Sequence, residues 1–404
     1  MLVFEPEGNG HQQEWLEHLI AHAADRPGLE QLWIVAPAGL CQALRPHRAG
    51  DRVRLLLMTA GEERRCQHAN IAIGGLWRWW TMRRYLRRTG AEAGHFLQLD
   101  HLSLPLALGL RLGGRPVGGI LFRPSVHYGD LGPYRPSWRE RVRDARKGVL
   151  YRLMLRNPAL HSVLSLDPHF PRYVEAHYSH AHKVRRLRDP AHPLHPSAAE
   201  DQAITADVPP TRMLFSLFGY LTERKGVLVL LEALRLLPPL RRARLAVIVA
   251  GRTDPALRDA MTHLRARVAR DCPELWLHYA DRRLSDGELT DLVTGSDVVL
   301  APYQRFVGSS GVLLWAAQAG RPLLTQEIGL MGRLVRDHGL GLTADTSDPV
   351  ALAAAMDTMI ARGPASFFDP VAARIFADQC TPDSFADTVI GSMTGEAVRE
   401  PVAV

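Results

Sequence analysis

Three residues with small side chains stand where a chain can bind an anion. Ser309, Ser310 and Gly311 lead into an apolar helical segment that begins at Val312 and ends at Gly320. The first four N–H groups of a helix have no partner inside it, and the helix dipole adds about half a positive charge there. Small side chains let an anion approach these groups closely. The segment therefore predicts a pyrophosphate site, with an ordinary N-cap as the alternative interpretation.

A second loop carries cations behind an apolar strand. Gly219 permits a tight turn before Tyr220, and Arg224 and Lys225 stand at the start of the next helix. Both cations can meet phosphate oxygens there. The alternative for Lys225 is a solvated surface lysine.

A third loop contains two adjacent arginines. Ser285 and Glu288 have the spacing of a capping box, which would occupy both side chains at the start of a helix. That arrangement leaves Arg282 and Arg283 free in the loop. Open α/β sheets bind ligands at the carboxyl ends of their strands, where all three loops are expected to lie.

Apolar strands alternate with amphipathic helices in both halves of the chain, which is typical of parallel α/β sheets. A stretch rich in Pro, Ala, His and Asp, residues 189–210, is predicted to link the halves. In the first half, the predicted strands are Leu2–Phe4, Leu32–Ala36, Val53–Leu57, Phe96–Leu99, Gly119–Phe122 and Ser162–Leu166, with helices at Gln12–Ala24 and Leu76–Thr89. In the second half, the strands are Met213–Phe218, Leu245–Ala250, Leu275–His278, Asp297–Ala301 and a short apolar strand after Pro322, with helices at Val227–Leu236, Ala256–Ala269 and Ser285–Thr294.

The three loops, in this order and spacing, resemble the donor-nucleotide domain of family-4-like, retaining glycosyltransferases with the GT-B fold. The segments FGYLTERKGVLVLLEAL, LHYADRRLSDGELTDLVTGSDVVLAPY and GSSGVLLWAAQAGRPLLTQEIGLMGRLVRDHGLG carry the resemblance, which covers Met213 to about Gly341 well. It implies an α/β fold of two Rossmann-like domains facing each other across a cleft, with a C-terminal helix returning towards the first. The expected domains are an acceptor domain over 1–195, a donor domain over 211–372, and a C-terminal helix and tail over 373–404.

The resemblance also implies roles for individual residues. Lys225, with Arg224 beside it, corresponds to the family's diphosphate-binding lysine, and Ala280–Arg283 corresponds to its base-reading loop. Ser309–Gly311 corresponds to its diphosphate-binding helix start. His127 resembles the family's histidine at the interdomain cleft, so we expect it to contact the donor sugar or steer the transferred group. A structural histidine is the alternative.

Three positions depart from the family pattern. Val307 and Trp315 stand where the family commonly has two glutamates, which contact the donor sugar and the ribose hydroxyls. Tyr220 stands in place of an arginine. Neither Val nor Trp accepts a hydrogen bond through its side chain as a carboxylate does. The sequence leaves two outcomes open, catalysis with an altered nucleotide preference and an inactive relative.

Two further features of the sequence indicate where an acceptor would bind and whether a metal ion is needed. Gly8, Gly10 and His11 are predicted to line an acceptor pocket. No D-x-D triplet occurs in the chain, which argues against a metal-bridged diphosphate. We therefore expect no metal and no cofactor besides a nucleoside-diphosphate-sugar donor. Lys225, Arg224 and the helix N-terminus would meet the charge of the leaving group.

The net charge of +7 is unevenly spread, because residues 76–160 contain 16 Arg and Lys against 5 Asp and Glu. Within this region, Trp77–Arg88 mixes aromatic and basic residues at helical spacing, and Trp138–Arg156 is a second basic helix. Such a helix can attach to an anionic membrane surface. Alternatively, its Trp and Leu side chains pack against the sheet while the arginines face water. No recognised nucleic-acid module accompanies these residues, so no nucleic-acid partner is expected.

The remaining features concern compartment and overall function. Four cysteines without a C-x-x-C pair indicate reduced thiols and argue against structural zinc. The first residues are predicted to form a strand and not a signal peptide, and no apolar run is long enough to span a membrane. We expect a cytoplasmic enzyme, with peripheral attachment to the inner face of the membrane left open. It would transfer a sugar to a polysaccharide, lipid-linked or small-molecule acceptor. The alternatives are a GT-B-fold sugar-nucleotide epimerase and a non-catalytic nucleotide-sugar-binding protein.

Overall fold

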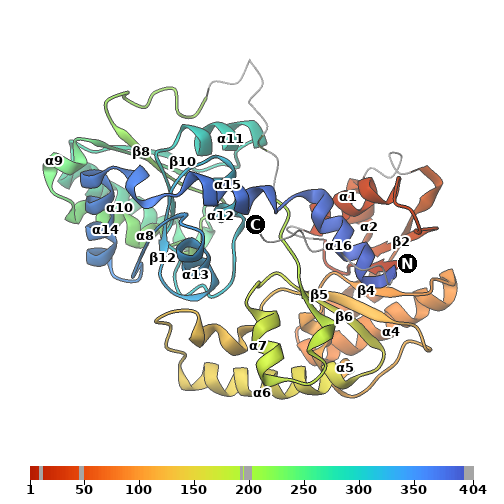
Figure 1. Ribbon diagram of the computed structural model, residues 1–404. Helices are drawn as coiled ribbons and strands as arrows, with labels where there is room; N and C mark the ends of the chain where they lie inside the picture. Colours follow the sequence, from red (N-terminus) through yellow and green to blue (C-terminus); the bar gives the residue numbers. More distant parts are fainter. Residues whose placement is uncertain (9–11, 45–49, 192–193, 195–202, 395–404) are drawn as a thin grey trace. The chain divides into compact units, whose positions relative to one another are not determined.

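The computed structural model describes residues 1–8, 12–44, 50–191, 194 and 203–394. The chain forms two compact units (Figure 1). The first comprises Met1–His127, Pro136–Pro190 and the chain from Cys380, and the second comprises Tyr128–Arg135 and Ala191–Gln379. The chain therefore enters each unit more than once, and the last helix of the described residues, Pro382–Thr394, belongs to the first unit.

Seven parallel strands form the sheet of the first unit, in the order β3-β2-β1-β4-β5-β6-β7. The first three strands lie where the sequence predicts them, and the next three begin two residues earlier than predicted. β4 ends at Phe96 because Leu99 already has a helical backbone ahead of the turn Asp100–Leu102. The seventh strand was not predicted. The strands are β1 (Leu2–Phe4), β2 (Leu32–Ala36), β3 (Val53–Leu57), β4 (Gly94–Phe96), β5 (Val117–Leu121), β6 (Leu160–Ser165) and β7 (Val184–Arg186).

Helices cover both faces of this sheet (Figure 1). Successive strand residues point to opposite faces, so Leu2 and Phe4 join one core and Val3 joins the other. The first core is closed by α3 (Ala60–Cys66), α4 (Ile71–Thr89), α5 (Ser103–Ala107), α6 (Trp138–Arg156) and α7 (Phe170–His177). The second is closed by α1 (Gln12–Ala23), α2 (Ala38–Ala43) and α16 (Pro382–Thr394), where Trp15 of α1 contacts Phe385 of α16.

Six parallel strands form the sheet of the second unit, in the order β10-β9-β8-β11-β12-β13. The strands are β8 (Met213–Phe218), β9 (Leu245–Ala250), β10 (Trp276–Ala280), β11 (Val298–Ala301), β12 (Leu323–Gln326) and β13 (Gly341–Ala344). The helices are α8 (Val227–Leu236), α9 (Pro239–Arg242), α10 (Arg258–Asp271), α11 (Asp286–Gly295), α12 (Gly311–Gln318), α13 (Gly329–Asp337), α14 (Pro349–Arg362) and α15 (Pro370–Asp378). β13 is the one strand of this list that the sequence analysis did not include.

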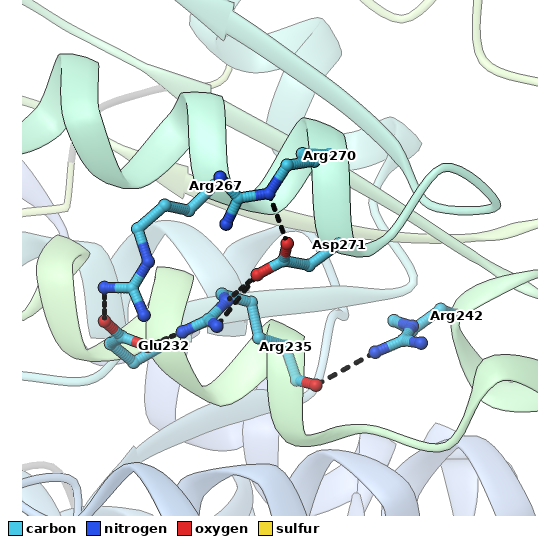
Figure 2. A network of polar contacts seen from close by, with 6 residues as sticks. All are labelled: Glu232, Arg235, Arg242, Arg267, Arg270 and Asp271. Carbon is cyan, nitrogen blue, oxygen red and sulfur yellow. Dashed lines mark hydrogen bonds and ion pairs between the residues drawn. The ribbon is translucent and has the colours of Figure 1, made fainter.

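A network of charged side chains joins α8 to α10 (Figure 2). Arg235 contacts Glu232 one turn earlier and Asp271 at the end of α10, and Arg267 of α10 contacts Glu232 at 3.1 Å. Partly exposed ion pairs contribute only about 0–1 kcal/mol each. The apolar core between these helices and the sheet, around Leu231 and Leu264, therefore supplies most of their attachment.

Three properties of the described residues bear on the expected chemistry. Their four cysteines are buried free thiols. Over the same ranges, no helix is long and apolar enough to cross a bilayer. No group of three or more His, Cys, Asp or Glu side chains in the described part of the chain is placed to hold a metal ion.

Candidate nucleotide-sugar site

Lys225 and the start of α12 are brought together by a tyrosine. The Lys225 ammonium is buried and donates to the Tyr303 hydroxyl at 2.8 Å and to the Phe218 carbonyl at 3.3 Å. The Tyr303 hydroxyl also lies 2.8 Å from Ser310 Oγ. Lys225 is therefore not a solvated surface lysine, and it reaches the predicted pyrophosphate site through a residue that the sequence analysis missed.

Two glycines, at the two ends of the loop after β8, allow this loop to pack closely. Gly219 has φ +104°, and a Cβ there would lie 3.3 Å from the Lys225 amine. Gly226 has φ +71°, and a Cβ there would overlap the Pro302 carbonyl oxygen at 1.8 Å. The loop after β8 therefore packs directly on the loop after β11, which places Lys225 beside Tyr303.

The start of α12 presents backbone N–H groups. Ser310 is the N-cap residue, and its carbonyl accepts from Leu313 N at 3.0 Å. Its hydroxyl makes no capping hydrogen bond because it contacts Tyr303 instead. The ordinary N-cap interpretation thus holds for the backbone and is wrong for the side chain. Gly311 and Val312 supply the first N–H groups of the helix, which can bind an anion.

Arg224 extends the cationic surface beside Lys225. Its guanidinium is exposed and lies over the rings of Phe306 at 4.6 Å and Tyr303 at 5.7 Å. Buried hydrogen bonds fix the loop that carries these rings: Thr346 Oγ1 donates to the Tyr303 carbonyl, and the Gln326 side chain binds the backbone of Phe306. An exposed guanidinium held in place by aromatic rings can reach phosphate oxygens.

The loop after β10 differs from its prediction. Ser285 and Glu288 form the predicted capping box, but Glu288 also makes a two-point ion pair with Arg282. Arg282 is therefore not free in the loop, because the same carboxylate serves both the helix start and the guanidinium. Arg283 is exposed. Neighbouring Asp281 accepts from Thr253 N at 2.8 Å, and this hydrogen bond lowers the pKa of Asp281.

Val307 and Trp315 present no polar acceptor at the positions of the family's glutamates. Trp315 is 7% exposed and its ring meets Phe218 edge-on at 6.5 Å. Val307 acts through its backbone, because its carbonyl accepts from Leu330 N at 2.9 Å and its Cα packs against Gly329. The positions are used for packing within the second unit.

A cavity of about 250 Å³ opens beside Tyr303 within the second unit. Two acidic residues lie in its lining, Glu327 and Asp345, at the carboxyl ends of β12 and β13. The other lining residues are Pro133, Tyr134, Arg135, Arg305, Gln326, Ile328, Ala344, Thr346 and Ser347. Two acidic residues therefore line the same cavity as Tyr303, and neither was predicted as a site residue.

His127 lies in the first unit with a buried acidic partner. Its Nε2 is 2.8 Å from Asp167 Oδ2, and both side chains are at most 3% exposed. Its ring stacks on Tyr173 at 5.1 Å, and Asp167 also accepts from His169 N at 2.9 Å. A buried carboxylate fixes the orientation and tautomer of a histidine. The chain positions of β5 and β6 could have revealed Asp167, since both residues follow adjacent parallel strands.

Charged side chains gather after β1, near the predicted acceptor pocket. Glu7 forms an ion pair with buried Arg78 and accepts from Gln98 at 3.2 Å. Burial opposes ionisation of Glu7, yet the Arg78 guanidinium holds its pKa below the usual value. Gly8 is the adjoining residue, whereas Gly10 and His11 lie outside the described residues.

The buried carboxyl of Glu5, at the end of β1, should make the stability of the protein depend on pH. Burial raises the pKa of its carboxyl from 4.5 to about 8, so folding takes up a proton there between these values. The wild-type protein should lose free energy of unfolding as the pH rises from about 5 to about 8. Glu5→Gln removes this titration, so its stability relative to wild type should increase over that range. The free energy of unfolding of both proteins is measured with denaturant at several pH values. An equal dependence on pH in wild type and in the variant would contradict the raised pKa of Glu5.

The fold and the site can now be compared with known proteins. HepE from Anabaena, solved in complex with UDP, aligns with a TM-score of 0.67 and 15% identity over 98% of this chain and 99% of that one. WaaG, a glycosyltransferase involved in lipopolysaccharide biosynthesis, aligns with a TM-score of 0.63 and 16% identity over 98% of this chain and 100% of that one. Sucrose-phosphate synthase from Thermosynechococcus elongatus aligns with a TM-score of 0.63 and 16% identity over 98% of this chain and 95% of that one. The chain has the two-domain α/β architecture of GT-B glycosyltransferases, as the sequence predicted.

The second unit also matches a family model. Residues 212–362 match glycosyl transferases group 1, and this range contains Lys225, Tyr303, Ser310 and most of the residues that line the cavity. A comparison with curated protein sequences finds no match. Residues 212–362 thus form a domain similar to glycosyl transferases group 1, and this match supports a transferase enzyme.

Proposed function

We propose that this protein transfers a sugar from a nucleoside-diphosphate sugar to an acceptor, without a metal ion and with retention of configuration. The hydrogen bonds that join Lys225 through the Tyr303 hydroxyl to Ser310, at the start of α12, are the observation that carries the proposal. The HepE structures with UDP and with UDP-glucose support a donor of this class. The assignment to the retaining, family-4-like group rests on the sequence resemblance alone.

In this proposal, the leaving diphosphate is stabilised by groups already held in place. The Lys225 ammonium and the first N–H groups of α12 lie on either side of Tyr303, so both can bind diphosphate oxygens. Arg224 adds an exposed cation. Preorganised donors of this kind stabilise charge that develops as the sugar–phosphate bond breaks. His127 is assigned to the donor sugar, Gly219 and Tyr220 to the donor loop, and Arg283 to the base.

A non-catalytic nucleotide-sugar-binding protein is the second candidate, favoured by the buried Trp315 and by Val307. A panel of nucleoside-diphosphate sugars separates the two functions. An enzyme releases nucleoside diphosphate slowly by hydrolysis and is stabilised by its preferred donor. A binding protein is stabilised without release. If no donor raises the melting temperature or is hydrolysed, both functions are excluded.

Turnover should persist in the presence of EDTA. The expectation rests on the cations that meet the diphosphate in the proposed site, Lys225 and Arg224, with the N-terminus of α12. Release of nucleoside diphosphate is measured with and without chelator, after dialysis. A loss of turnover that added magnesium or manganese restores would disprove metal independence.

The acceptor and the membrane contact remain proposals. Gly8, with Gly10 and His11, is assigned to the acceptor pocket, and Trp77–Arg88 to an anionic membrane surface on a cytoplasmic protein. The packing interpretation holds for one tryptophan of this segment, since Trp79 is 1% exposed and stacks on Phe96. Trp77 and Trp80 are 39% and 51% exposed, so only they can face a partner.

A further inference from the structure

The outer side of α6 carries an exposed apolar stripe. Trp138, Val142, Val149 and Leu153 are 69%, 63%, 59% and 40% exposed. With 3.6 residues per turn, these four positions fall within about 60° of one another around the helix axis. They therefore form one continuous strip of apolar side chains along the whole helix.

Cations flank this stripe on both sides, and acidic groups lie away from it. Helical spacing places Arg139 and Arg146 along one edge and Arg141 and Arg152 along the other, and all four are exposed. The two acidic residues of α6 project to the opposite side. Glu140 caps the helix at Ser137, and Asp144 accepts from Ser125 Oγ at 2.7 Å.

The fold does not need the apolar stripe for its core. The buried residues of α6 are Tyr151, Met154 and Leu155, all in its last turns. The earlier turns run along the edge of the first unit (Figure 1), where Lys147 donates to Ser125 Oγ at 3.2 Å. An exposed apolar strip bordered by cations marks a surface that is covered by a partner.

We propose that α6 binds reversibly to the surface of an anionic lipid bilayer. The four apolar side chains would enter the headgroup region, and the flanking arginines would contact lipid phosphates while their stems cover apolar surface. A nucleic acid would match the arginines but would leave the apolar stripe in water. α6 belongs to the first unit and Lys225 to the second, so the inference does not rest on the proposed sugar transfer.

The test is co-sedimentation of the full chain with vesicles of phosphatidylglycerol and phosphatidylcholine, or of phosphatidylcholine alone. Binding is expected only to the anionic vesicles and is expected to weaken with salt. Arg139→Gln and Arg146→Gln should each weaken binding about fivefold, from about 1 kcal/mol per cation. Trp138→Ser combined with Leu153→Ser should weaken it more than about tenfold, because both lose buried apolar area.

Leu240→Ser combined with Val371→Ser is the matched control, because it removes two exposed apolar side chains, 83% and 68% exposed, from the second unit. This control should bind like wild type. The inference fails if wild type stays in the supernatant with anionic vesicles, or if the α6 variants bind these vesicles as tightly as wild type does. It also fails if sedimentation without lipid shows a dimer that Trp138→Ser dissociates, since a second copy would then cover the stripe.

Discussion

Lys225→Met is expected to weaken binding of a nucleoside diphosphate by about 10- to 150-fold. The variant loses one charge-assisted hydrogen bond to phosphate, worth about 1.5–3 kcal/mol, while methionine keeps most of the buried stem. Isothermal titration with UDP and GDP measures the change. Tyr303→Phe should have a smaller effect, about fivefold, since it removes only the neutral hydroxyl that joins Lys225 to Ser310.

Arg282→Ala provides the control for this prediction. Arg282 lies in a predicted nucleotide-binding loop but is paired with Glu288, so its loss should change diphosphate affinity far less than the loss of Lys225. Unchanged affinity in a folded Lys225→Met variant would remove Lys225 from the site. An equal loss in both variants would indicate a general effect of positive charge.

Gly226→Ala is expected to destabilise the second unit by about 2–5 kcal/mol. The residue has φ +71°, which costs an L-residue about 1–2 kcal/mol, and the new Cβ would overlap the Pro302 carbonyl, adding about 1–3 kcal/mol. The loop after β11 must move to relieve the overlap, so Tyr303 leaves Lys225 and diphosphate binding falls as well. Chemical denaturation and titration measure the two effects.

Gly320→Ala separates strain from overlap. Gly320 has φ +64°, but a Cβ there meets nothing within 4 Å. It should cost only the backbone strain, about 1–2 kcal/mol, and leave diphosphate binding unchanged. If the Gly226→Ala and Gly320→Ala variants are equally stable, the overlap with the Pro302 carbonyl does not contribute to the loss of stability in Gly226→Ala.

The local pattern of apolar and polar residues predicted the strands that alternate regularly with helices. It failed for strands that form only because of tertiary contacts. β8 and β9 have the predicted bounds because each is a six-residue run between polar turns that is apolar except for Ser216. β7 and β13 were not predicted, since Val184–Arg186 has one apolar residue and Gly341–Ala344 is short and begins with glycine. Each is an edge strand, ordered by the neighbouring strand and not by its own sequence.

The site was predictable where a motif carries it and not where partners are distant in sequence. Lys225 and Ser310 were found from loop motifs, but Tyr303 between them has no motif and is identified only by its position in space. Arg282 was misjudged because one carboxylate, Glu288, can satisfy a helix start and an arginine together. Capping boxes account for backbone groups and do not exclude a further partner.

The return of α16 to the first unit affects how the chain folds during synthesis. Phe385, Val389 and Ile390 complete the apolar core around Trp15, yet they are made after every residue of the second unit. The second unit can therefore fold on the ribosome while the first still exposes one apolar face. Until α16 is made, the nascent chain exposes apolar surface of the kind that promotes aggregation, and α16 removes that exposure by covering Trp15.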